Sequence, residues 1–249
     1  KGLTFSDLNA RVVWNRGILQ FQPVGLKIFG GQVSGSATWD AERFYARRDA
    51  PELTTSLKVD GVSLTEAAAW YKPEMGKLVG GRFSGQLTTA TNGFEPEDFM
   101  RTVKGRLKGH VAGGSFETLQ VLDGALGSFI RSPETKDYLL GKASQEACLR
   151  KHFEGDMDVQ IAPEGFDIQH GGLRFETGSS LDVKGKLDKS LAVALQGSFY
   201  AGASCIGGDV RSCLAGPDGK AAIPFRIQGT ADKPEAKVEI ETLARKVAS

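Results

Sequence analysis

The stretch VKGRLKGHV, residues 103–111, alternates between two kinds of residue along its whole length. Val103, Leu107 and Val111, with two glycines between them, occupy every second position, and basic residues and a histidine fill the others. Successive side chains of a β-strand point to opposite faces of its sheet. The alternation therefore predicts a strand with one apolar and one solvated face, which is typical of antiparallel sheets.

The same alternation recurs along much of the chain. It is found in residues 83–87, 157–161, 166–175, 181–187, 191–199, 223–227 and 236–240. Turn residues separate several of these segments: Pro163-Glu164-Gly165 predicts one hairpin, and Asn15-Arg16-Gly17 predicts another near the N-terminus. The sequence predicts about a dozen strands.

Helical periodicity is confined to a few segments. Residues 64–71 follow Ser63, a suitable N-cap, and stop before Pro73. A helical insertion is expected at about 116–150, and a short helix at about 242–248. Because helices do not alternate with strands, a parallel doubly wound sheet is excluded. The predicted class is mostly β (α+β): a curved antiparallel sheet forming an open groove or a flattened barrel, with two or three covering helices.

Glycine is unusually abundant, at 32 of 249 residues. The phrase Gly-Gly-x-x-Ser-Gly begins at Gly30 and again at Gly80, each time entering a predicted strand. Other glycines fall in the middle of strands, where they favour curvature or close approach of another backbone. The predicted structural glycines are Gly30, Gly31, Gly80, Gly81, Gly105, Gly185 and Gly229.

Charge and composition exclude several classes of protein. The 31 Lys and Arg residues nearly balance the 30 Asp and Glu residues, so a nucleic-acid binder is not expected. The sequence contains neither an apolar run long enough to span a membrane nor a signal peptide. Since it begins at Lys1, we interpret it as an excised portion of a longer protein.

The cysteines and histidines form no recognisable reactive motif. Cys205 and Cys213 flank a short loop and form a candidate disulfide, which leaves Cys148 unpaired. The three histidines are far apart in sequence, so no metal site is expected. Carboxylates cluster at Glu95, Glu97 and Asp98, where placement near a helix N-terminus explains them better than acid–base catalysis.

The sequence also lacks a nucleophile elbow, a phosphate-binding loop and a dinucleotide-binding glycine motif. We therefore expect a protein that is not an enzyme and that uses no cofactor.

Several short glycine-based motifs occur in a characteristic order. They are FGGQVSG at 29–35, GRLKG at 105–109, GGSF at 113–116, and IPFRIQGT at 223–230 followed by Lys233-Pro234. In this order the chain resembles, over nearly its whole length, the C-terminal region of the AsmA family of envelope proteins. The loop at 202–216 and the turn at 163–165 depart from the family pattern.

The resemblance implies both a location and a function. It implies a periplasmic portion of a Gram-negative protein, anchored in the inner membrane by a segment upstream of Lys1. Its curved sheet would form a groove for bridge-like phospholipid transport towards the outer membrane. Residues 1–249 would then be one unit, and its partners would be phospholipid or another acyl lipid, together with other envelope proteins.

The residues themselves leave two arrangements open. A dozen strands with one apolar face and few helices must either close on themselves or hold an apolar ligand. Alternation alone favours a closed core, and the resemblance favours a groove. The candidate groove residues, each equally suited to a core, are Phe83, Leu87, Leu107, Val111, Val159, Ile168, Phe175, Val183, Leu195, Phe199, Phe225 and Ile227.

A third hypothesis is a scaffold that binds another envelope protein by strand addition at an open sheet edge. A long edge strand without proline, bulge or inward lysine would favour that hypothesis.

Overall fold

The computed structural model describes residues 4–42, 50–93, 95–116, 152–176, 178–201, 221–231 and 233–239. The strands are β1 (Phe5–Asn15), β2 (Ile18–Ile28), β3 (Gly31–Asp40), β4 (Glu52–Ser63), β5 (Val79–Asn92), β6 (Lys104–Phe116), β7 (Phe153–Ala162), β8 (Gly165–Phe175), β9 (Ser180–Asp188), β10 (Ala192–Ala201), β11 (Ala221–Thr230) and β12 (Lys233–Val238). Three short helices accompany them in the described part: α2 (Leu64–Tyr71), α3 (Met75–Leu78) and α4 (Pro96–Thr102).

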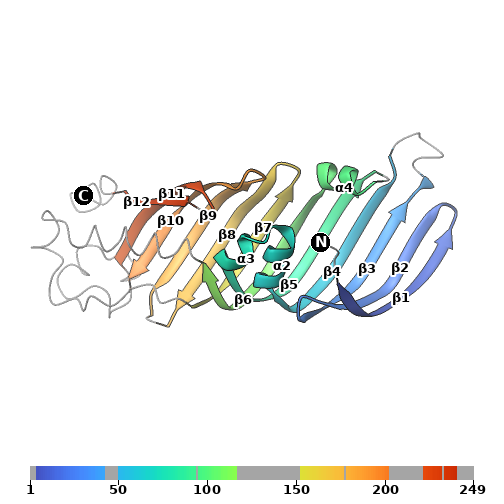
Figure 1. Cartoon of the computed structure of the whole chain (residues 1–249), viewed down its shortest axis with the longest axis horizontal. Coiled ribbons are helices and arrows are strands. Elements are labelled where there is room, and N and C mark those ends of the chain that lie inside the picture. Colours follow the sequence, from blue (N-terminus) through green and yellow to red (C-terminus); the bar gives the residue numbers. More distant parts are fainter. Residues whose placement is uncertain are drawn as a thin grey trace, which may run out of the picture. The chain divides into compact units, whose positions relative to one another are not determined.

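The strands form one sheet in which their order is the order of the sequence, from β1 to β12 (Figure 1). The sheet is antiparallel and is not closed into a barrel. The prediction of a mostly β fold built on a curved antiparallel sheet is confirmed, and the flattened-barrel alternative is not.

The helix predicted at residues 64–71 is confirmed with the same bounds. The Ser63 hydroxyl accepts a hydrogen bond from the Glu66 backbone N–H, which is an N-cap. Helix α4 carries Glu97 and Asp98 in its first turn, as the interpretation of that acidic cluster requires. The predicted helix at 242–248, nearly all of the insertion at 116–150, and the three cysteines lie outside the described residues.

The chain divides into two compact units. Unit 1 comprises residues 1–111 and 157–167, and unit 2 comprises residues 112–156 and 168–249.

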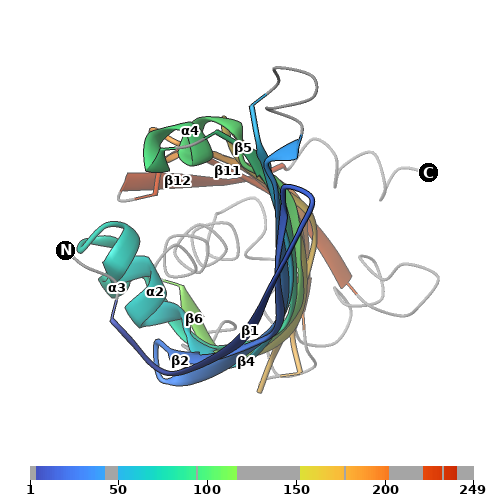
Figure 2. The same ribbon diagram turned by 90° about the vertical axis from the view of Figure 1, so that its right-hand side faces the viewer.

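In unit 1 the helices lie on one side of the sheet. Figure 2 shows α2 and α3 at one end of strands β1–β5 and α4 at the other end, on the same side. We call the face on that side the inner face. Thr91 is in β5 and Thr102 is at the end of α4, and their hydroxyl oxygens lie 2.9 Å apart. Because α4 lies on the inner side, the Thr91 side chain points to the inner face.

In unit 2 a tight turn joins β9 to β10. The Asp188 carboxylate accepts hydrogen bonds from the Ser190 hydroxyl (2.6 Å) and the Ala192 N–H (2.9 Å). The Ser190 bond is the main reason that the pKa of Asp188 lies below its ordinary value, and the Ala192 bond adds to it.

The lowered pKa of Asp188 leads us to expect that the stability of the fold depends on pH at acidic pH. A carboxylate with a lowered pKa in the folded state contributes stability above its unfolded pKa, and that contribution disappears as the pH falls through the folded pKa. We therefore expect wild type to be more stable than Asp188→Asn at pH 7, and the difference in the free energy of unfolding to shrink as the pH falls below 3.8 and through the lowered pKa of Asp188. Urea unfolding of both proteins across this range measures it. A difference that is the same at every pH would contradict the assignment.

Candidate functional site

The inner face of unit 1 is built from apolar residues that lie opposite one another on neighbouring strands. Directly paired residues of an antiparallel sheet point to the same face. The pairing therefore yields rows that cross the sheet: Trp14-Leu19-Trp39-Leu53-Thr91, Val12-Phe21-Ala37-Thr55-Thr89, Val24-Gly35-Leu57-Leu87, Leu26-Val33-Val59-Gly85 and Phe5-Ile28-Gly31. Thr91 belongs to the first row and therefore places that row on the inner face. The five rows cross β3 at every second residue, so all of them lie on the same face.

The outer face of the same strands is polar. Its rows include Gln20-Thr38-Thr54 and Ser34-Lys58-Gln86. On β6 and β7, Arg106 donates two hydrogen bonds to Asp158, at 2.7 and 2.6 Å. These bonds, and then the negative charge, raise the pKa of Arg106. Ion pairs between strands account for these outer charges.

Much of the inner face is accessible to solvent. Val59, Val62, Thr91 and the β5 residue Phe83 are buried there, and most other members are half-buried. On the edge strand β1, Val12 and Trp14 are 55% and 58% exposed. Apolar side chains on three or more adjacent strands therefore remain incompletely covered, which is unusual for a folded domain.

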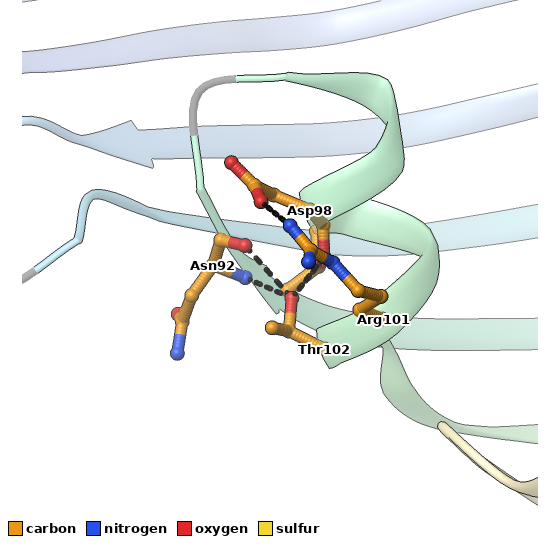
Figure 3. A network of polar contacts seen from close by, with 5 residues as sticks. Asn92, Asp98, Arg101 and Thr102 are labelled. Atoms are coloured by element: carbon orange, nitrogen blue, oxygen red, sulfur yellow. Dashed lines mark hydrogen bonds and ion pairs between the residues drawn. The ribbon is translucent and has the colours of Figure 1, made fainter.

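The α4 end of the inner face is held by polar contacts (Figure 3). The Thr102 hydroxyl bonds both the backbone N–H and the carbonyl of Asn92, each at 2.8 Å, and also the Asp98 carbonyl at 2.9 Å. Arg101 pairs with Asp98 on the same helix. Hydrogen bonds of this density fix the helix firmly on the end of β5.

The α2 end has a different chemistry. The rings of Phe29 and Trp70 lie 6.2 Å apart, and Trp70 and Tyr71 are 48% and 42% exposed. Arg82 donates a hydrogen bond of 2.6 Å to the Gly30 carbonyl, which ties the two Gly-Gly phrases of the sequence together.

A pocket of about 640 Å³ opens at the α2 end. Phe5, Ile28 and Phe29 are among its lining residues, together with Gly30 and Glu66. Its volume lies within the range of pockets that hold small molecules. Lys27 also contributes to the lining, and its ammonium pairs with Asp7 at 2.8 Å. The hydrogen bond with Asp7 raises the pKa of Lys27.

The apolar face of unit 2 is packed more tightly. Its rows are Gly185-Leu195-Ile227-Ala236, Val183-Gly197-Phe225-Val238 and Leu181-Phe199-Ile223. Phe199, Ile223 and Phe225 are at most 1% exposed. The Phe225 ring lies 3.0 Å from the position that a Cβ of Gly197 would occupy, so the ring covers the glycine backbone of the neighbouring strand.

The twelve predicted groove residues lie in both units, and in each unit some are buried and others half-buried. In unit 1, Phe83, Val111 and Val159 are buried, and Leu87 and Leu107 are half-buried. In unit 2, the buried members are Phe175, Phe199, Phe225 and Ile227, and the half-buried members are Ile168, Val183 and Leu195. The half-buried residues are the better candidates for contact with a ligand.

Sequence reasoning did not select the inner-face residues of β1–β4. Leu19, Phe21, Leu26 and Leu57 are half-buried members of the rows described above. Their alternation was visible in residues 18–28 and 52–62, and it could have identified them.

The predicted structural glycines have two roles. Gly31, Gly105 and Gly185 lie so close to a neighbouring strand that an added Cβ would collide with its backbone. Gly30, Gly81 and Gly229 have positive φ angles of 66°, 109° and 106°. Gly80 lies in β5.

The described residues contain neither a membrane-spanning helix nor a group of side chains arranged for a metal ion. None of their helices is long and apolar enough to cross a membrane. No group of three or more His, Cys, Asp or Glu side chains among them is arranged to hold a metal ion. Comparison of the chain with models of protein families, with curated proteins and with solved structures finds no match.

Proposed function

We propose that this protein is a non-enzymatic lipid carrier whose inner face shields the acyl chains of phospholipid from water. The observation that carries the proposal is the set of apolar, half-buried rows that cross β1–β5 on a sheet that is not closed. The motif order shared with the AsmA family supports the wider context: a periplasmic part of an inner-membrane-anchored bridge that conducts phospholipid towards the outer membrane. No cofactor takes part.

The energetics of such a face suit transfer better than storage. Burial of one acyl chain stabilises the complex by about 0.8 kcal/mol per CH2, or roughly 10 kcal/mol per chain before losses. The same chain gains a similar free energy in a bilayer, because both environments exclude water. Exchange between protein and membrane is therefore close to balanced and reversible.

A change at Leu57 tests the proposal. The purified chain is incubated with vesicles of phosphatidylethanolamine and phosphatidylglycerol, separated from them, and examined by native mass spectrometry. We expect wild type to carry phospholipid and Leu57→Asp to lose most of it, because a carboxylate would lie on the apolar inner face.

The matched control is Ser56→Asp, which places the same charge on the neighbouring, exposed residue. It should keep its lipid. Circular dichroism verifies folding, and if Leu57→Asp does not fold, the milder Leu26→Ser replaces it. A folded wild-type protein without lipid, or equal loading of all variants, would refute the proposal.

One observation favours the alternative of a scaffold that binds other envelope proteins. Strand β1 is 11 residues long, contains no proline, and is exposed at every position. By contrast, the other edge strand, β12, carries Pro234 and two lysines, which discourage strand addition. However, the register of β1 with β2 shifts twice, between Ser6 and Asn9 and between Ala10 and Val12. Such bulges hinder pairing of a further strand, so the lipid carrier remains our first choice.

A further inference from the structure

The two ends of the inner face of unit 1 differ in a way that bears on how a lipid lies there. At the α4 end, Thr91, Asn92 and Thr102 satisfy one another in a hydrogen-bond network. At the α2 end, large aromatic side chains are exposed beside a pocket. The α2 end combines exposed aromatic rings with a pocket that has both apolar and polar lining residues.

The aromatic residues at the α2 end have an amphipathic arrangement. Trp70 contacts Phe29, a lining residue of the pocket, yet about half of its surface is exposed. The next residue, Tyr71, is also exposed. Trp and Tyr combine a large apolar ring with one polar atom, and they are enriched where an apolar region meets water. The level of a lipid's glycerol backbone is such a boundary.

Both signs of charge lie beside one point of the pocket wall. Gly30 forms that point, and a Cβ added there would lie 3.6 Å from Glu66 Oε1 and 3.8 Å from Arg82 Nη2. Lys27, the other charged residue of the lining, is paired with Asp7. Of the two, Glu66 belongs to the pocket lining and Arg82 does not, so the carboxylate is the group that complements a headgroup carrying an ammonium.

We infer that the pocket at the α2 end holds the headgroup and glycerol region of a zwitterionic phospholipid, with its acyl chains directed along the inner face towards α4. This inference rests on the proposed function and adds the orientation and the headgroup class of the lipid. Phe5, Ile28 and Phe29 contact the upper acyl carbons. Glu66, which lines the pocket, faces the ammonium.

The three tryptophans allow the orientation to be measured. Trp70 lies at the α2 end, whereas Trp39 lies near the other end of β3 in the row of Leu19 and Leu53. At roughly 3.3 Å per residue, Gly31 and Trp39 are about 26 Å apart along the strand. An acyl chain spans about 15 Å, half of a bilayer core. Its terminal carbons therefore come nearer to Trp39 than its glycerol does.

The experiment uses two single-tryptophan proteins, W14F/W39F and W14F/W70F. Each is loaded from vesicles of phosphatidylethanolamine brominated either near the glycerol or near the chain end, and is then separated from the vesicles. Bromine quenches only nearby indoles. We expect Trp70 to lose most of its emission to the glycerol-proximal bromines and little to the distal ones, and Trp39 to show the opposite order.

The headgroup class is tested with Glu66→Gln on equimolar vesicles of phosphatidylethanolamine and phosphatidylglycerol. Loss of one exposed charge contact should lower the ratio of bound phosphatidylethanolamine to phosphatidylglycerol by about threefold. Glu74→Gln, which removes a carboxylate that is not among the lining residues, is the control and should leave the ratio unchanged.

The outcomes separate the two claims. If no phospholipid is bound by any protein, the proposed function fails and the inference fails with it. If lipid is bound but Trp70 is not quenched, or the order of quenching is reversed, the function stands and the orientation is wrong. An unchanged lipid ratio in Glu66→Gln overturns the headgroup assignment alone.

Discussion

Replacement of Gly35 by alanine is expected to lower the free energy of unfolding by more than about 4 kcal/mol. Gly35 lies in β3 with a φ of 153°, and an added Cβ would be 2.9 Å from the Cα of Leu57 and closer still to the Ser56 carbonyl. Both contacts are with the backbone of β4, which cannot move aside without breaking its pairing with β3. Urea unfolding followed by circular dichroism measures the loss.

The control for this variant is Gly25→Ala on the adjacent strand. A Cβ at Gly25 would meet only the Asn9 carbonyl, at 4.0 Å, which is an ordinary contact. This change should leave stability within about 1 kcal/mol of wild type, because alanine also restricts the unfolded chain. If both variants lost the same stability, the close approach of β3 to β4 at Gly35 would not be the cause.

Replacement of Phe83 by alanine is expected to cost about 3–5 kcal/mol, the usual range for a buried phenylalanine. Phe83 is 4% exposed, and its ring lies 2.8 and 2.7 Å from the positions that Cβ atoms of Gly85 and Gly109 would occupy. The ring therefore covers bare backbone on β5 and β6, and its removal leaves a cavity that no neighbouring side chain can fill.

Phe5→Ala is the matched control, since Phe5 is 49% exposed and lies in the same unit. Its loss should lie within about 0.5 kcal/mol, the usual range for surface positions. Thermal unfolding of the two variants beside wild type gives the comparison. A small loss in Phe83→Ala would mean that the ring is not part of the packed core and would return it to the groove candidates.

Much of the fold follows from the sequence because alternation is a local property. The apolar and polar positions of 103–111 and 191–199 define strands and their faces without knowledge of any neighbour. Strand β4 was not predicted, although Leu53, Leu57 and Val59 alternate with other residues along it, because the run Thr54-Thr55-Ser56 interrupts the apolar positions. The acidic cluster at Glu97 and Asp98 indicated the start of helix α4, but its extent was not predicted because seven residues are too few for a helical period to be recognised.

The exposure of the residues in the candidate site could not be predicted from alternation. Alternation shows that Phe225 and Leu57 both point to an apolar face, but it does not show that Phe225 is 1% exposed and Leu57 only half-buried. That difference depends on what the rest of the chain places over each face. The pocket at the α2 end likewise requires the ends of β1 and β2, the turn at Gly30 and helix α2 to meet.

The strand order of the sheet has a consequence for how such a protein grows. Each strand pairs with the strands before and after it in the chain, so an extra hairpin inserted at a turn displaces no existing pair. Lengthening the chain would then lengthen the sheet in proportion, much as repeats extend a solenoid. If the strands form in order from the N-terminus, each new strand also finds its partner strand already formed. The fold is therefore suited to assembly in one direction, strand by strand, from the N-terminus to the C-terminus.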